Sequence, residues 1–384
     1  MSALTETLPR TPKEWRSKMA SSKMTKKTIH EADLASASKF GLDQFLLLRV
    51  LWKPYEDPAE IHKMLEIKNE KDRALELLHG YASWSTYCKS FERRGGLPEG
   101  TFAIARHYQL EVVKTRENAD PRAFHTPIAN RTRNRQARGT KVDFYSQTPT
   151  KVRGTLSSLS IDSNSNDETI DYEDDDDDDP ETPLKPTSPM PQELASILYP
   201  PTKDEQIVNT ALVVFLNALT IHFSLSLDWT LHRKSFTAAF KEAEFQARTD
   251  GYLGDSHGEP SVLIEVKPVT RSRKLQLIQI QESAQMVAWI KSDTQAAQKR
   301  RQMRLHISQD RHEVYVTVAK YNEGYLNYLN NTPSPRDDSD RSFLTMHQFG
   351  PWNTLDKSHI RDLGPILLAI SLQADTDSKA GYFG

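Results

Sequence analysis

The stretch Ser261-Val-Leu-Ile-Glu265-Val-Lys267-Pro268 is a run of apolar and β-branched residues that ends in Glu-x-Lys. Such a run predicts a buried strand. Because side chains i and i+2 of a strand point to the same face, Glu265 and Lys267 share one face, and Ile264 and Val266 share the other. A carboxylate and an ammonium are costly to bury at the end of an apolar strand unless they pair or bind something.

A second stretch, Ala247-Arg-Thr-Asp250-Gly-Tyr-Leu253, precedes the first. Asp250 ends a strand-like run, and the loop from Gly251 to Pro260 can join the two stretches as a hairpin. This hairpin would bring Asp250 close to Glu265. Two carboxylates and a lysine that converge in this way predict a Mg²⁺ site for phosphodiester hydrolysis. The prediction depends on closure of the hairpin.

The composition of the 384 residues sets limits on the class of protein. Hydrophobic residues make up 37% of the chain and the mean hydropathy is −0.64, so part of the chain is not core. A single cysteine, Cys88, excludes a disulfide framework and a cysteine-based zinc site, and it favours an intracellular protein, nuclear or cytoplasmic. No run approaches about 18 apolar residues, so no membrane span is expected.

Charge is distributed unevenly along the chain. Residues 1–153 hold 28 Lys and Arg against 18 Asp and Glu, and residues 154–184 hold twelve acids and no base. Residues 185–384 hold 22 of each sign, which returns the net charge of −2. The average therefore conceals a basic first part that is joined to an acidic strip.

These patterns divide the chain into four parts. We expect a disordered tail over residues 1–30, a small α-helical region over 31–117, a disordered linker over 118–191 and an α/β domain over 192–384. The linker contains a basic arm, which either contacts nucleic acid or nuclear-import partners, or is a solvated tail. Its candidate nucleic-acid-binding residues are Arg131, Arg133, Arg135 and Arg138. The acidic strip can fold back on this arm and compete with nucleic acid.

Periodicity places the elements of the α/β domain in order. The expected helices cover residues 206–222, 275–291, 322–329 and 355–374, the last interrupted by Gly364-Pro365. The expected strands cover residues 227–236, 244–253, 261–269, 305–308, 313–319 and 343–352, the last at a sheet edge. Glu205 precedes the first helix on the stripe of Val208 and Leu212, so it either faces the pocket of Asp250 or is a surface residue that the helix dipole stabilises.

The order helix, three strands, helix, strand, with Asp250 and Glu265-x-Lys267 on the central hairpin, resembles the PD-(D/E)XK nuclease superfamily. The resemblance covers about residues 205–318 and implies a restriction-endonuclease-like αβββαβ core with a mixed sheet. The superfamily's Pro-Asp is absent, because Thr249 precedes Asp250. Beyond this core, Gly324-Tyr-Leu-Asn-Tyr-Leu and Phe349-Gly-Pro-Trp352 resemble fungal proteins that carry such a domain.

The resemblance also implies roles for individual residues. Asp250 and Glu265 would ligate Mg²⁺ or Mn²⁺ with help from the Val266 carbonyl, and Lys267 would act on the attacking water and the developing charge. Glu205 would match the acid of the first helix. Gln285, four residues before Trp289, resembles the Gln-x-x-x-Tyr element of the exonuclease branch, with the Trp facing either a base or the core.

Three functions follow from these observations. The first is Mg²⁺-dependent hydrolysis of nucleic acid, with DNA as the expected substrate. The second is a catalytically silent nucleic-acid or protein-interaction module on the same fold, in which Asp250, Glu265 and Lys267 form structural salt bridges. The third is a chromatin-associated adaptor that acts through its basic arm and acidic strip. The sequence indicates no oligomeric state.

Overall fold

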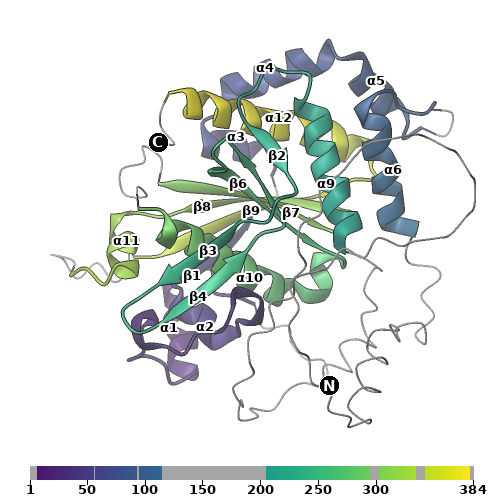
Figure 1. Cartoon of the computed structure of the whole chain (residues 1–384). Coiled ribbons are helices and arrows are strands. Elements are labelled where there is room, and N and C mark those ends of the chain that lie inside the picture. The colour runs from purple at the N-terminus through teal and green to yellow at the C-terminus, as the bar shows by residue number, and fades with distance from the viewer. Residues whose placement is uncertain are drawn as a thin grey trace, which may run out of the picture. The chain divides into compact units, whose positions relative to one another are not determined.

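The structure, a computed structural model, describes residues 7–55, 57–92, 95–114, 205–294, 302–333 and 342–380. These segments belong to one compact unit, which comprises Met1–Ala119 and Tyr199–Gly384. They form an α/β structure with a mixed seven-stranded sheet that carries helices on both faces (Figure 1). The predicted linker over residues 118–191 lies outside the described residues.

The sheet has the strand order β1-β9-β8-β7-β6-β5-β2. Two neighbouring pairs, β6 with β7 and β1 with β9, are parallel, and the other pairs are antiparallel. The strands are β1 (Val50–Tyr55), β2 (Asp228–Thr230), β5 (Gly251–Gly254), β6 (Pro260–Lys267), β7 (Met303–Asp310), β8 (Glu313–Lys320) and β9 (Leu344–Asn353). A separate antiparallel ribbon consists of β3 (Ser235–Ala239) and β4 (Glu244–Arg248).

Ten α-helices and two short 3-10 turns occur in the described segments. The helices are α1 (Pro12–Ser21), α2 (Leu42–Leu47), α3 (Ala59–Leu65), α4 (Lys68–His79), α5 (Ala82–Lys89), α6 (Thr101–Lys114), α9 (Glu205–Thr220), α10 (Arg271–Ser292), α11 (Glu323–Leu329) and α12 (Lys357–Lys379). The turns are η1 (Ile29–Glu31) and η2 (Ala37–Lys39).

Strand β6 separates two apolar clusters because its side chains alternate between the faces of the sheet. Ile264 and Val266 pack in the cluster that includes α9 and α12. Leu263, on the face of Glu265 and Lys267, packs in the cluster that includes α10 and the N-terminal elements. Helix α10 joins the parallel strands β6 and β7, a connection that needs a crossover of this length.

Helix α9 forms where the apolar periodicity predicts it. Val208, Leu212, Phe215 and Leu219 follow i+3 and i+4 spacing, and all four are buried against the sheet and its neighbouring helices. The hairpin expected between residues 305–308 and 313–319 is also present, as β7 and β8.

The prediction of a disordered tail over residues 1–30 is wrong for residues 7–30. Helix α1 starts at Pro12 with the side chain of Thr11 as its N-cap. The apolar residues of this segment are buried in the cluster with α10, and they include Leu8, Met19, Met24 and Ile29. They are too far apart in sequence to form one amphipathic stripe, which is why periodicity does not reveal them.

The region over residues 31–117 is mainly helical, and it also supplies a strand that the sequence analysis does not predict. Strand β1 pairs in parallel with β9, over the register Val50 to Leu344 through Tyr55 to Phe349. Strand β9 is therefore internal, and the expectation that residues 343–352 form a sheet edge is wrong. These N-terminal elements share one compact unit with the α/β elements.

Two strands that the sequence analysis predicts as continuous are each divided. Residues 227–236 form β2 and β3, and residues 244–253 form β4 and β5. In each case the two halves pack in different apolar clusters, as Trp229 and Phe236 show. The chain must cross from one face of the sheet to the other, so a single strand cannot span either segment.

Helix α12 continues through Gly364-Pro365, where the sequence analysis predicts an interruption. Gly364 lies against the indole ring of Trp84, at a distance that leaves no room for a β-carbon. The glycine therefore permits close packing of α5 on α12, and it does not end the helix.

Candidate active site

Asp250 lies at the junction between the ribbon and the main sheet. Its N–H donates to the Ile264 carbonyl over 3.1 Å, immediately before Gly251 pairs with Ile264. The hairpin on which the sequence prediction depends is thus closed by β5 and β6. Asn209 of α9 donates to the Asp250 carbonyl over 2.9 Å, which fixes this junction to the first turns of α9.

The carboxylate of Asp250 bonds to the next peptide of β6. Its Oδ2 accepts the N–H of Val266 over 3.1 Å, at the point where β6 extends past the start of β5. The N–H and C=O of one strand residue point to the same neighbour. The carbonyl of Val266 therefore points toward the side of the strand that holds Asp250.

Lys267 lies between two carboxylates that come from different elements. Its Nζ donates to Oε1 of Glu265, two residues earlier on the same face of β6. It also donates to Oε1 of Glu205, the first residue of α9, over 3.3 Å. The side chain of Glu265 is 3% exposed and that of Glu205 is 42% exposed, so this chain of ion pairs leads from the interior to the surface.

Two glutamines of α10 donate to the same carboxylate. Gln281 Nε2 bonds to Glu265 Oε1 over 2.5 Å, and Gln285 Nε2 bonds to Glu265 Oε2 over 2.6 Å. Gln285 also bonds to the Arg248 carbonyl over 2.7 Å and is fully buried. Gln281 is not among the site residues predicted from the sequence. Its position one helical turn before Gln285 is the signal that identifies it.

Trp289 belongs to the core, which decides between the two positions considered for it. Its side chain is buried and its ring lies 6.2 Å from that of Phe236, between centroids. The guanidinium of Arg304 lies 5.1 Å from the Trp289 ring centroid. Trp289 does not line the pocket that contains Asp250.

Burial and charge act in opposite directions at Glu265. Desolvation raises the pKa of Glu265 to about 8, and the charge of Asp250 acts in the same direction, whereas Lys267 and Gln285 lower it. Desolvation lowers the pKa of Lys267, but Glu265, Glu205 and Asp250 outweigh it and raise this pKa above its usual value. The two shifts conflict, because the first favours a neutral Glu265 and the second an ionised one. We infer that Lys267 stays charged, since three carboxyl groups surround it.

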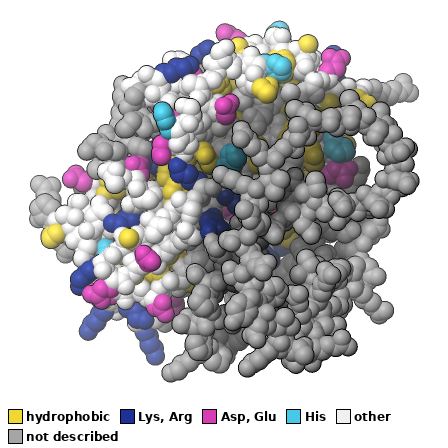
Figure 2. Space-filling model, in the orientation of Figure 1, with side chains coloured by type: hydrophobic (Ala, Val, Ile, Leu, Met, Phe, Trp, Pro, Cys, Tyr) yellow, Lys and Arg dark blue, Asp and Glu magenta, His cyan; other side chains and the backbone are white. Residues whose placement is uncertain are grey.

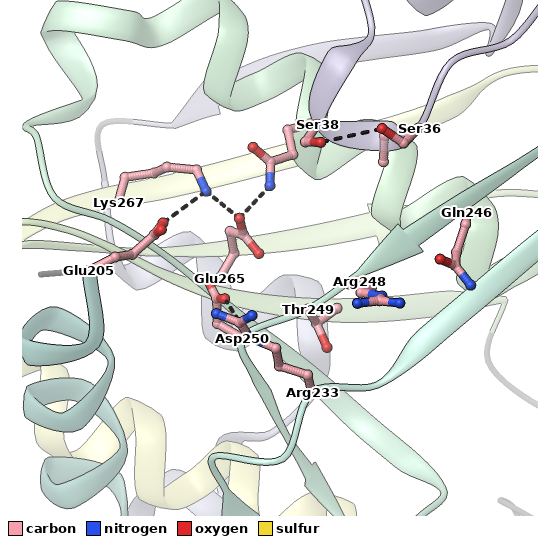
Figure 3. Close-up of a pocket in the computed structure, with 12 residues that line it drawn as sticks. Ser36, Ser38, Glu205, Arg233, Gln246, Arg248, Thr249, Asp250, Glu265 and Lys267 are labelled. Atoms are coloured by element: carbon pink, nitrogen blue, oxygen red, sulfur yellow. Dashed lines mark hydrogen bonds and ion pairs between the residues drawn. The ribbon is translucent and has the colours of Figure 1, made fainter. Parts of the chain in front are cut away.

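A pocket of about 450 Å³ opens beside this group, and Figure 3 shows the side chains that line it. Glu205, Asp250, Glu265 and Lys267 all line it, so the structure brings these four predicted residues together. Gln285 lies behind Glu265, outside the lining. The remaining lining residues are Ser36, Ala37, Ser38, Arg233, Gln246, Arg248, Thr249 and Gln281.

A buried cation, Arg271, lies at the start of α10, directly after the segment that links this helix to β6. The Arg271 guanidinium is almost fully buried and bonds to Asp310 over 2.5 Å. It also lies 4.1 Å from the Tyr315 ring centroid. Its other hydrogen-bond partners are Glu282, Ser308 and Gln348. Because Lys267 and Asp310 are paired in the register of β6 and β7, this cluster adjoins the pocket group.

The described residues set limits on metal and membrane sites. Within them, no three His, Cys, Asp or Glu side chains are grouped so that they could hold a metal ion. A cation at Asp250 and Glu265 would need further oxygen ligands from carbonyls, water or substrate. In the same residues, no helix is both long and apolar enough to cross a membrane. Arg131, Arg133, Arg135 and Arg138 of the predicted basic arm lie outside the part of the chain that the structure describes.

No protein-family model, curated protein or solved structure matches this chain.

Proposed function

We propose that the chain hydrolyses phosphodiester bonds of nucleic acid at a Mg²⁺-dependent site of the PD-(D/E)XK type. One observation carries the proposal. Asp250, Glu265 and Lys267, with Glu205, line one pocket although they come from the β4–β5 junction, β6 and α9. Two carboxylates and a lysine that line one pocket are the residues that this chemistry needs.

The order of elements around the pocket supports this assignment. Helix α9 is followed by the antiparallel strands β2, β5 and β6, then by α10 and by β7, which is parallel to β6. That is the αβββαβ order implied by the resemblance to restriction-endonuclease-like proteins. The ribbon of β3 and β4 is an insertion between the first two of these strands.

The donor set fits a hard divalent cation such as Mg²⁺ or Mn²⁺. Asp250 and Glu265 offer carboxylate oxygens, and the Val266 carbonyl points to the same side of β6, so these three residues would hold the ion. When bound, the cation would polarise a phosphoryl oxygen and lower the pKa of a bound water.

The chain's own residues would position the groups of the site and stabilise the charge that develops during the reaction. Because its pKa is raised, Lys267 keeps its proton and acts as a charge that stabilises the developing negative charge, and it does not act as a general base. Gln281 and Gln285 orient the Glu265 carboxylate from α10, and Glu205 holds Lys267 from the other side. DNA is the proposed substrate, in the nucleus or the cytoplasm.

A second candidate function is a catalytically silent nucleic-acid or protein-interaction module on the same fold. One observation favours it: Lys267 is paired with two carboxylates, and Glu265 accepts from Lys267, Gln281 and Gln285, so the group is satisfied without a ligand. A Mg²⁺ titration separates the two functions. A cation site predicts a rise in melting temperature with Mg²⁺, and a silent module predicts none.

The direct experiment incubates the purified full chain with labelled single-stranded DNA, duplex DNA and RNA, in Mg²⁺ or in EDTA. The proposal expects cleavage of at least one substrate in Mg²⁺ and none in EDTA. Cleavage that is equal in EDTA, or absent with every substrate in Mg²⁺ and Mn²⁺, would overturn it.

A further inference from the structure

The residues that line the pocket are almost all polar or charged. Apart from Ala37, its residues are charged or carry a hydroxyl or an amide, and none is aromatic. Proteins that bind bases of single strands use aromatic side chains as stacking platforms. Contacts to phosphate and sugar use arginine, serine, threonine and glutamine. The lining therefore matches the sugar-phosphate backbone and not a base.

Arg248 is the cation of this pocket that is available to a ligand. It lies at the end of β4, where alternate side chains are exposed, and it faces the pocket across from Glu205 and Lys267 (Figure 3). Among the described residues, no hydrogen bond or ion pair holds its guanidinium. The other arginine of the pocket, Arg233, is engaged at longer range, with its Nε 3.8 Å from Asp250 Oδ1.

The N-terminal segment forms a fixed wall of the pocket. Ser36 and Ser38 lie on the side of the pocket away from Asp250 and Arg233 (Figure 3), and Ala37 between them in the chain also lines it. Ala37 is buried, and the ring of Phe40 lies 4.8 Å from that of Phe245 in β4, between centroids. These contacts anchor the wall to the core cluster with α10.

The size of the pocket limits what can lie between the wall and the carboxylates. A volume of about 450 Å³ corresponds to a sphere roughly 10 Å across, whereas a whole duplex is wider than its own major groove, which measures about 12 Å. One strand fits this space, and a duplex does not.

Elsewhere, Figure 2 shows charged side chains of both signs interspersed over the described part of the surface in view.

We propose that the pocket binds one single strand of nucleic acid through its sugar-phosphate backbone, with Arg248 holding a phosphate next to Asp250 and Glu265 and with residues 36–38 excluding a duplex. This inference rests on the proposed function, since it assigns the substrate class of that site. Because the contacts are to phosphate, binding is independent of base sequence.

The test is fluorescence anisotropy of the full chain with a labelled twelve-nucleotide single strand and with a blunt hairpin duplex, in EDTA and in Ca²⁺. The variant is Arg248→Ala, and the matched control is Arg73→Ala, an exposed arginine of α4. We expect Arg248→Ala to weaken single-strand binding about tenfold and to reduce the salt slope by about 1, with no change for Arg73→Ala.

A second pair of variants tests the wall. Ser38→Trp should weaken single-strand binding, because an indole would occupy the pocket, whereas Lys39→Trp at the next exposed position should not. Equal binding by Arg248→Ala and the wild type, binding of the duplex as tight as that of the single strand, or no single-strand binding in either buffer would each overturn the inference.

The result is separable from the proposed function, because neither buffer requires cleavage. Single-strand binding that depends on Arg248, together with no hydrolysis in Mg²⁺, would sink only the proposed catalysis. Hydrolysis in Mg²⁺ with Arg248-independent binding would sink only the substrate assignment.

Discussion

Asp250 Oδ2 accepts the backbone N–H of Val266 over 3.1 Å, so a side chain replaces a strand partner at the end of the hairpin. The backbone of β5 pairs with β6 only as far as Ile264. At Val266, two residues further along β6, the carboxylate of Asp250 replaces the β5 backbone as the hydrogen-bond acceptor. This one bond holds the Asp250 carboxylate against the strand that carries Glu265 and Lys267.

The Asp250–Val266 bond predicts that two substitutions of Asp250 differ in stability but not in activity. Asp250→Asn keeps an oxygen acceptor for the Val266 N–H, whereas Asp250→Ala leaves this buried donor unpaired, which costs about 1–3 kcal/mol. Both remove a charge that the proposed cation requires. Urea unfolding and cleavage assays check this. Equal stabilities of the two variants, or cleavage by either one at the wild-type rate, would contradict the assignment.

Glu265 predicts a pH dependence of stability. Its carboxyl loses a proton near pH 4.5 when exposed and near pH 8 in the folded chain. Between these values the folded state binds more protons, so this group makes the free energy of unfolding fall as pH rises. Glu265→Gln removes that contribution. We expect the wild type to lose stability relative to Glu265→Gln from about pH 5 to pH 8, and added Mg²⁺ to reduce the loss. If the free energies of unfolding of the wild type and Glu265→Gln followed parallel curves against pH, the raised pKa of Glu265 would be contradicted.

Arg271 predicts a large loss of stability on truncation. Arg271→Ala leaves Glu282 and Asp310 buried without their cation, which typically costs about 3–5 kcal/mol. Arg273→Ala, at an exposed position two residues later, is the matched control and should change stability by less than about 0.5 kcal/mol. Chemical denaturation of both variants measures the difference, and similar midpoints would contradict a structural role for the cluster.

The periodic elements of the fold are predictable from sequence, and the N-terminal contribution is not. The stripe of Val208, Leu212 and Phe215 predicts α9 because it lies within one amphipathic element. Strand β1 escapes prediction because it follows the helical residues 42–47 closely and contains Pro54, which is unusual within a strand. Its partner β9 is almost 300 residues away in the chain, a separation at which local patterns carry no information.

Trp52 of β1 tests whether the N-terminal elements unfold together with the α/β elements. Its indole is buried and donates to Ser283 of α10 over 2.9 Å. Trp52→Ala should cost about 3–5 kcal/mol, and Trp52→Phe should cost less. We expect a single unfolding transition by both circular dichroism and tryptophan fluorescence. Two separate transitions would show that residues 7–114 form an independent domain.

For the site, strand parity predicts the shared face of Glu265 and Lys267, and the hairpin predicts the position of Asp250. The resemblance adds Glu205 and Gln285, and the structure places both in contact with this group. Ser36 and Ser38 could not be predicted, because a wall from a segment some 200 residues upstream is a tertiary contact with no local pattern. Arg248 has the same strand parity as Asp250, but parity alone does not show that its charge is available.

The most direct measurement of the central claim is cleavage of a labelled single strand in Mg²⁺ by the wild type, by Lys267→Ala and by Lys241→Ala. Lys241 is an exposed control that pairs with Glu242, away from the pocket. We predict that Lys267→Ala reduces the rate by roughly 100-fold or more at unchanged secondary structure, and that Lys241→Ala cleaves at the wild-type rate. Cleavage by Lys267→Ala at the wild-type rate would contradict it.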